Sequence, residues 1–180
     1  MTAYRSVIAE HYREGKYMAS EQSFDVVSTY DEQELVNALD QTRREVTTRF
    51  DLKDTGTEID HEKDTLTITS DTDFTLKSVR DVLETKMVRR NLALKILKLG
   101  EVEVAAGARV RQKITLQKGL SSELAKEISK EIRTNFPKVK PQIQGDAVRV
   151  SGKNRDDLQA VIAFLKQKDY PVPLQFENYR

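Results

Sequence analysis

The sequence predicts an α+β protein built from a two-layer unit that occurs twice. Apolar residues alternate with a period of two in some segments and recur at helical spacing in others, and one apolar pattern is present in both halves. The matched positions, at identical offsets, are Leu66, Ile68, Leu76, Val79 and Leu83 in the first half and Val148, Val150, Leu158, Val161 and Leu165 in the second. This repetition indicates an internal duplication.

In the first half, strand and helix patterns follow one another from Ser23 onward. Asp31 is a suitable N-cap for the first helix, and Glu34 stands three residues later, as in a capping box. The expected elements are a strand at 23–28, a helix at 31–48, a connector at 49–60 that turns into a strand, a strand at 65–70, and a helix capped by Asp73.

The second half repeats this order after a small, irregular segment at 100–107 that is the best linker candidate. The expected elements are a strand at 109–116, a helix at 121–134 that starts with Ser121 or Ser122, a hairpin at 139–152 turning at Gly145 and Asp146, a helix at 154–168, and a strand at 171–178. Strand–helix–strand–strand–helix–strand is the ferredoxin-like order. We therefore expect ferredoxin-like domains at 23–100 and 108–180, preceded by a leader at 1–22 that is a poorly ordered extension or an artificial addition.

Composition and charge exclude several classes of protein. The formal net charge is +1, whereas a protein that coats nucleic acid by bulk electrostatics is strongly basic. The chain has no cysteine, which excludes disulfides and thiolate chemistry and favours a reducing compartment. No apolar run is long enough to cross a bilayer, and the N-terminus lacks the apolar core of a secretory signal. We expect a cytoplasmic protein that does not contact membranes.

No set of residues in the sequence is typical of an enzyme. His11 lies in the leader and His61 in a polar segment, and neither lies within a recognisable catalytic or phosphate-binding motif. The acidic pairs Asp71/Asp73 and Asp156/Asp157 fall where helices begin, so capping and the helix dipole account for them. We expect no enzymatic activity, no metal and no cofactor.

The strand at 109–116 carries a basic row on one side. Val110, Ile114 and Leu116 share one face, so Arg109, Arg111 and Lys113 share the other, and these three cations are called the basic row below. By the same parity the outward positions of the second half are Lys140, Gln142, Gln144, Arg149 and Gln175. Such side chains suit phosphates and base edges, although an ordinary solvated sheet face has the same composition. Phe24 and Phe176 have inward parity, so base stacking on the sheet is not expected.

Two loops are further candidates for anion binding. The loop at 49–57 places Arg49 and Lys53 near Gly56, and the segment at 151–157 places Lys153 and Arg155 at a helix start. In both places a charged turn is the commoner explanation.

Several strings of residues are similar to one known family. TRFD (48–51), VRQ (110–112), the stretch at 143–165 and PLQFENYR (173–180) resemble the YajQ family of nucleotide-binding proteins, and the resemblance covers Ser23 to Arg180. It implies two ferredoxin-like domains that exchange their N-terminal strands, so that 23–28 joins the second sheet and 109–116 the first. It also implies nucleotide or RNA binding, a cyclic di-GMP effector role with a transcription-factor partner in some members, and no established enzymatic activity.

Motif and parity together give the expected function and site. The leading hypothesis is a binding protein for a guanine nucleotide, in particular cyclic di-GMP; an RNA- or tRNA-binding module and a protein-interaction scaffold are the alternatives. The predicted ligand-binding residues are Arg49, Asp51, Lys53, Arg109, Arg111, Gln112, Lys113, Gln142, Gln144, Arg149, Lys153, Arg155 and Gln175.

Overall fold

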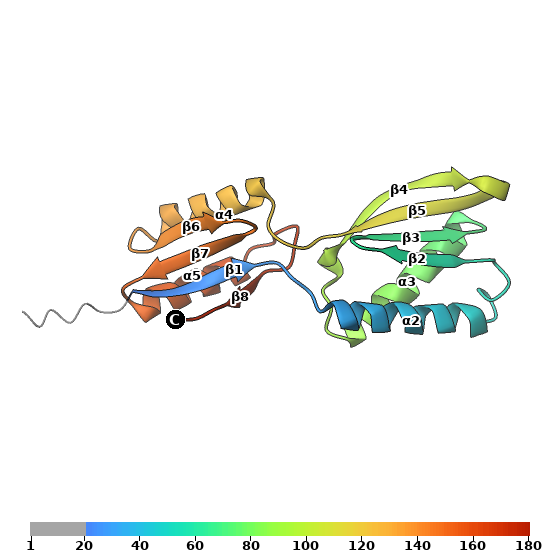
Figure 1. The fold of residues 1–180 in the computed structure, drawn as a ribbon, viewed down its shortest axis with the longest axis horizontal. Helices are drawn as coiled ribbons and strands as arrows, with labels where there is room; N and C mark the ends of the chain where they lie inside the picture. Colours follow the sequence, from blue (N-terminus) through green and yellow to red (C-terminus); the bar gives the residue numbers. More distant parts are fainter. Residues whose placement is uncertain (1–20) are drawn as a thin grey trace, which may run out of the picture.

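The computed structural model describes residues 21–180, which form two α/β units lying end to end (Figure 1). The first unit consists of α2 (Glu32–Thr48), β2 (Glu58–Glu62), β3 (Thr65–Ser70), α3 (Asp73–Arg89), β4 (Leu97–Ala105) and β5 (Arg109–Leu116). The second unit consists of β1 (Gln22–Val27), α4 (Ser122–Asn135), β6 (Lys140–Gln144), β7 (Ala147–Gly152), α5 (Arg155–Lys166) and β8 (Gln175–Glu177). The predicted leader lies outside the described residues, except for its last two positions.

Each unit has a four-stranded antiparallel sheet, and the two sheets exchange one strand. Their strand orders are β2-β3-β5-β4 and β6-β7-β1-β8. The N-terminal strand β1 pairs with β7 and β8, where Phe24 lies opposite Val150, and β5 pairs with β3 and β4, where Ile114 lies opposite Leu66. Both orders are ferredoxin-like once the exchanged strand is counted in its new sheet. The predicted fold class, including the duplication and the exchange, is confirmed.

The start of α2 follows the predicted N-cap but not the full capping box. The backbone N–H groups of Gln33 and Glu34 donate to Oδ1 of Asp31 at 2.9 and 3.1 Å. The carboxylate of Glu34 does not return to the cap; its Oε2 accepts from Nη1 of Arg90 at 2.6 Å. An ion pair with the end of α3 has therefore replaced the second half of the box.

The other helices begin at short polar side chains that accept a hydrogen bond from the first turn. The cap of α3 is Thr72, whose Oγ1 accepts from the N–H of Thr75 at 3.1 Å, and not Asp73 as expected. Thr72 has the extended backbone that a cap needs, whereas Asp73 is already helical. Ser121 caps α4 and Asn154 caps α5.

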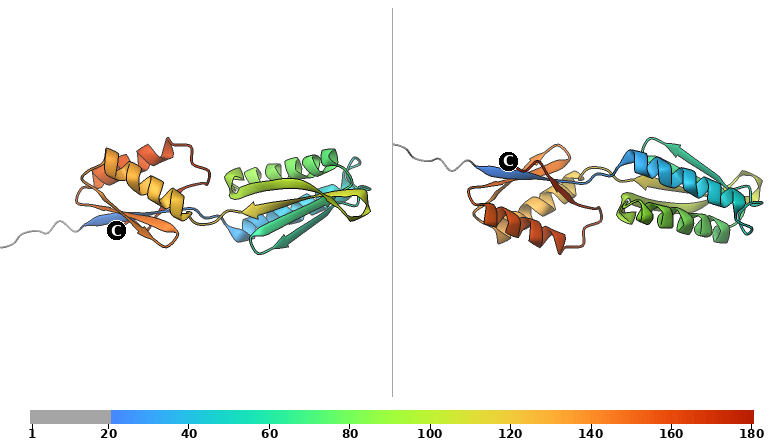
Figure 2. Two further views of the ribbon diagram at one scale, coloured as in Figure 1. Left: turned by 90° about the horizontal axis from the view of Figure 1, so that it is seen from above. Right: turned by 90° about the horizontal axis from the view of Figure 1, so that it is seen from below.

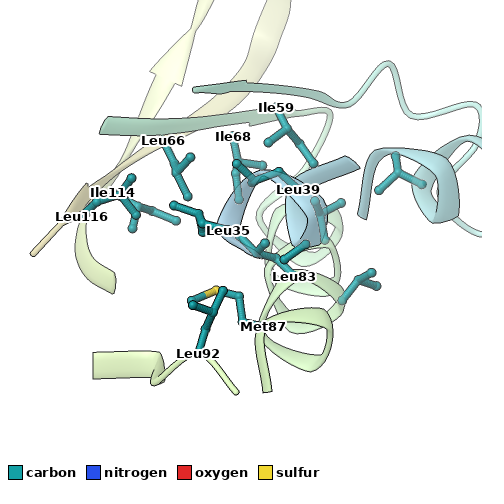
Figure 3. Close-up of a cluster of buried hydrophobic side chains, with 14 of the residues drawn as sticks. Leu35, Leu39, Ile59, Leu66, Ile68, Leu83, Met87, Leu92, Ile114 and Leu116 are labelled. Atoms are coloured by element: carbon teal, nitrogen blue, oxygen red, sulfur yellow. The ribbon is translucent and has the colours of Figure 1, made fainter. Parts of the chain in front are cut away.

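One apolar core lies between sheet and helices in each unit. In the first core, Leu35 and Leu39 of α2 and Leu83 of α3 pack against Leu66 of β3 and Ile114 of the exchanged strand (Figure 3). In the second core, the exchanged strand contributes Phe24 and Val26, which pack with apolar residues of α4 and α5. Because each exchanged strand supplies fully buried residues, neither core is complete without the other half of the sequence.

The segment at 100–107 is not a linker. Most of it belongs to β4, the nine-residue edge strand of the first sheet, which continues into a short 3-10 turn. A bulge between Leu99 and Val102 interrupts the alternation by which a strand is recognised in a sequence. Gly100 occupies the bulge because a Cβ there would lie 2.7 Å from the carbonyl oxygen of Lys113.

The units are joined instead by two extended segments, residues 28–31 and 117–121, which Figure 2 shows between them. The segments touch where the N–H of Gly119 donates to the carbonyl of Ser28 at 2.7 Å. Nearby, Nζ of Lys118 pairs with Glu32 at 2.6 Å. The chain therefore crosses between the units twice, at one place.

None of the helices within residues 21–180 has the length and apolar character needed to cross a membrane.

Candidate functional site

The open face of the first sheet brings the basic row together with a row of hydroxyl groups. Strand β5 places Lys113 opposite Thr67 and Arg111 opposite Thr69 of β3, and all four side chains point away from the helices. Alternate residues of a strand lie roughly 7 Å apart, and directly opposed side chains have Cβ atoms about 5 Å apart. We call this surface, formed by Thr65, Thr67, Thr69, Arg109, Arg111, Lys113 and Thr115, the β3–β5 face. It is an array of cationic and hydroxyl donors.

Arg109 connects this face to the loop at 49–57. One Nη of Arg109 donates to the carbonyl of Gly56, and the other lies 3.4 Å from Oε1 of Glu58. Gly56 has a φ of +60°, a conformation that suits glycine at this turn. The loop is thereby held at the start of β5, as the expected strand exchange implies.

Carboxylates flank two of the three cations of the basic row. Glu103 of β4 accepts from Nη2 of Arg111 at 3.0 Å, and Glu58 pairs with Arg109 as described above. Lys113 is exposed and has no carboxylate partner within residues 21–180. An anion can therefore approach Lys113 directly, while at Arg111 it must displace or share Glu103.

Gln112 does not belong to the β3–β5 face. Its side chain points toward the helices and is buried, where Oε1 accepts from Nη1 of Arg80 at 3.1 Å and Nε2 donates to the carbonyl of Gly100 at 2.8 Å. It joins α3 to the bulge of β4 and has no exposed group for a ligand. Its parity with Val110 and Ile114 already placed it on the inner face.

The charged side chains of the loop at 49–57 bind one another. Arg49 donates to both carboxylate oxygens of Asp51, at 2.8 and 2.9 Å, and this hydrogen bonding lowers the pKa of Asp51. Arg49 also lines a hollow of about 240 Å³ between α2 and α3, so it lies on the helix side of the unit. Lys53 stands 5.5 Å from the ring centroid of Phe50. Arg49 and Asp51 are therefore not parts of the β3–β5 face.

Sequence reasoning overlooked Phe50 as a candidate. Its side chain is 88% exposed, whereas Leu52 two positions later is buried and anchors the loop. An exposed aromatic ring beside cations can stack on a nucleobase. In the sequence, an aromatic residue between charged residues of a loop was the feature that could have indicated Phe50 as a candidate.

The outward residues of the second sheet are divided between structural and exposed positions. Arg149 donates to both carboxylate oxygens of Asp25, at 2.7 and 2.9 Å, and Asn178 donates to the same carboxylate at 2.8 Å. Hydrogen bonding from Arg149 is the main cause of the lowered pKa of Asp25. The side-chain oxygen of Gln175 accepts from the N–H of Thr29 at 2.8 Å. Arg149 and Gln175 thus hold the exchanged strand and the crossing segment.

Two glutamines and two cations of the second unit remain accessible. Gln142 and Gln144 are exposed on the open side of β6. Lys153 lines a hollow of about 440 Å³ with Lys138 and Lys140, and Arg155 lines a separate hollow of about 510 Å³ beside the C-terminal residues. The predicted residues therefore occupy several separate places on two units, and only the basic row and the loop at 49–57 meet.

The geometry defines a class of protein: a pair of strand-exchanged ferredoxin-like units with an open sheet face, on which the cationic and hydroxyl donors of β3 and β5 lie beside carboxylates of β2 and β4. Comparison with known proteins gives the family. Residues 22–180 match the family described as "Nucleotide-binding protein YajQ-like", and the chain belongs to it.

Several curated relatives are similar over their full lengths. A protein of Synechococcus elongatus is 61% identical over 163 residues, and one of Chloroflexus aurantiacus is 59% identical over 165 residues. A protein of Thermosynechococcus vestitus is 60% identical over 163 residues. Each alignment covers 91% of this chain and 100% of the relative, and each relative is named a nucleotide-binding protein.

Proposed function

We propose that the chain is a non-enzymatic binding protein for a guanine nucleotide, that the ligand is cyclic di-GMP, and that it binds on the β3–β5 face. The observation that carries this proposal is the placement of Arg109, Arg111 and Lys113 by the exchanged strand beside the threonine hydroxyls of β3. The relatives named as nucleotide-binding proteins support the coarser part of the proposal, that the ligand is a nucleotide.

The chemistry of this face suits a compact dianion. Lys113 and Arg111 supply positive charge to phosphate oxygens, and the hydroxyl groups of Thr67 and Thr69 supply neighbouring donors. Glu103, when a phosphate takes its place on Arg111, can accept hydrogen bonds from the N–H groups of a guanine edge. A cyclic dinucleotide offers phosphates and guanine edges within one small molecule, so it can satisfy both kinds of group.

The proposal implies a place and a partner in the cell. A chain without cysteine that binds an intracellular dinucleotide belongs in the cytoplasm. Binding without chemistry changes the cell only through another molecule, and a transcription factor that distinguishes the bound from the free protein fits this role.

Calorimetry on the full chain tests the ligand. We expect heat of binding with cyclic di-GMP, weaker binding with GTP and ATP, and a modest dependence on salt. A short RNA that bridges both units would contact more phosphates, and its affinity would fall steeply with salt, with a slope of about −0.7 per phosphate contact. If the RNA binds tightly with such a slope and the dinucleotide does not, the RNA-binding alternative is correct. If every titration is silent, both are wrong and a protein-interaction scaffold remains.

Two substitutions test the site. Lys113→Ala and Arg111→Ala are each expected to weaken cyclic di-GMP binding about tenfold or more, because each removes a charge-assisted contact worth about 1.4 kcal/mol or more. Lys113→Ala is the sharper test, since it leaves no carboxylate unpaired among the described residues. Arg44→Ala is the matched control: Arg44 is an exposed arginine on α2, in the helix layer of the same unit. Unchanged affinity in both folded variants would refute this placement of the ligand.

A further inference from the structure

The outer edge of β4 is a long strand edge exposed to solvent. β4 ends the order β2-β3-β5-β4, and all of its residues from Lys98 to Val104 are exposed. Its apolar side chains contribute to this exposure: Leu99 is 45%, Val102 43% and Val104 84% exposed. An edge of this length with apolar side chains is a template for pairing with another strand.

The unpaired backbone groups of this edge belong to its apolar residues. The N–H of Gln117 donates to the carbonyl of Ile96. The odd-numbered residues of β5 therefore direct their backbone N–H and C=O groups toward β4. Their partners in β4, including Lys98 and Glu103, direct their N–H and C=O groups inward. The remaining residues direct these groups toward solvent. For Leu99, Val102 and Val104 this holds for both groups, whereas Leu97 offers only its C=O, because its N–H donates to the carbonyl of Leu94.

The pattern of β4 is complementary to itself when two copies run antiparallel. With a two-fold axis between Gly100 and Glu101, Leu97 of one copy lies opposite Val104 of the second copy, and Leu99 lies opposite Val102. All four residues lie on the helix side, and each has at least one unpaired backbone group, Leu97 its C=O alone. On the open side of the sheet, Lys98 of each copy lies opposite Glu103 of the other.

Two competing symmetric registers are disfavoured by charge. An axis through residue 98 would oppose two lysines, and an axis through residue 103 would oppose two glutamates, and like charges directly opposite destabilise a strand pair. The bulge, which usually protects an edge, falls on the proposed axis in both copies and is therefore matched.

We infer that the β4 edge is the interface of a symmetric homodimer, in which two first units join their sheets into one of eight strands. On the helix side, the exposed Val88 and Leu94 line a hollow of about 490 Å³ beside α3 and extend the apolar surface available for contact. The pairing uses a sheet edge and not the β3–β5 face, and the one residue that it shares with the proposed nucleotide site is Glu103. Lys98→Glu therefore tests the dimer without changing a residue of that site.

The mass of the full chain in solution tests the dimer. Sedimentation equilibrium over a wide range of concentration should give twice the 20.6 kDa of one chain, with reversible dissociation on dilution. Lys98→Glu and Glu103→Lys should each weaken the dimer at least tenfold, because each creates two like-charge pairs around the axis. Lys140→Glu, a matched reversal on the edge strand of the other sheet, should leave the mass unchanged.

Mixing the two weakened variants provides the decisive test of the proposed register. In a mixed dimer the introduced glutamate faces the introduced lysine, and the native Lys98 faces the native Glu103, so the dimer should return to the wild-type strength. Circular dichroism on each variant distinguishes loss of pairing from loss of folding. A wild-type chain that stays monomeric at every concentration overturns the inference. So does a dimer that Lys98→Glu leaves unchanged, or a mixture that fails to recover.

Discussion

Replacing Phe24 by alanine should destabilise the part of the protein that lies far from it in sequence. Phe24 precedes α2 by only a few residues, yet its ring is fully buried in the second unit, where it packs edge-on against Phe176 at 6.0 Å and stacks on Tyr179 at 6.1 Å between centroids. The change should therefore loosen α4 and α5, and leave α2 and α3 nearly unaffected.

The expected magnitude follows from this burial. Truncating a fully buried phenylalanine costs about 3–5 kcal/mol. Since 1.4 kcal/mol is a factor of ten, slowly exchanging amides of the second unit should lose roughly a hundred- to thousandfold or more in protection. The reciprocal variant is Ile114→Ala, which removes a buried residue of the first core and should cost about 2–5 kcal/mol there.

Native-state hydrogen exchange read by mass spectrometry separates the two units by peptide. Phe24→Ala should accelerate exchange in peptides from α4 and α5, and Ile114→Ala in peptides from α2 and α3. Phe50→Ala, at an exposed ring, is the control and should change neither. If Phe24→Ala instead accelerates exchange in α2 and α3, the strand is not exchanged and our assignment of the cores is wrong.

Two further predictions concern residues that hold the exchanged strand and the crossing. The lowered pKa of Asp25 means that its pairing with Arg149 stabilises the fold above its unfolded pKa of about 3.9, and that this contribution is lost as pH falls through the still lower folded pKa. Asp25→Asn should therefore cost about 1–2 kcal/mol near neutral pH and flatten the acid limb of the stability curve; an unchanged acid limb in denaturant titrations would contradict this. Gly119→Ala should cost about 1 kcal/mol or more, because Gly119 has a φ of +80° and a Cβ would lie 2.6 Å from Oδ2 of Asp146. Equal melting temperatures of variant and wild type would refute this.

The hydrophobic pattern of the sequence predicted most helices and strands of this fold. The resemblance to a known family supplied the exchange of strands, which the pattern does not show. The alternation at Phe24 and Val26 predicts a strand and indicates which of its sides is buried. It does not indicate which of the two sheets the strand joins. The choice of sheet depends on partners in β7 and β8 that are distant in sequence. Strand β4 was missed for a different reason: the bulge shifts its alternation by one residue, and its apolar side chains face solvent.

For the candidate site, the sequence predicted which side chains point outward from the sheets, but not which of them are engaged by other residues. Parity placed Arg111 and Lys113 on the open face, where the structure has them. Parity also placed Arg149 outward, but it could not show that the exchanged strand brings Asp25 beside Arg149 and engages it. Exposed rings such as Phe50 carry no periodic signal, because a loop has no repeating geometry.

The exchange of strands also fixes the order in which the chain can fold as it is synthesised. β1 leaves the ribosome first but has no sheet to join until β7 and β8 follow; Asp25 and Arg149, which pair across this gap, are 124 positions apart. The first unit closes earlier, when β5 arrives, and β1 must remain unpaired through that step. Contacts of such long separation are slow to form, and an unpaired apolar strand is exposed to aggregation while it waits. Because each sheet contains a strand from the other half of the sequence, neither unit can be transferred to another gene as a contiguous piece.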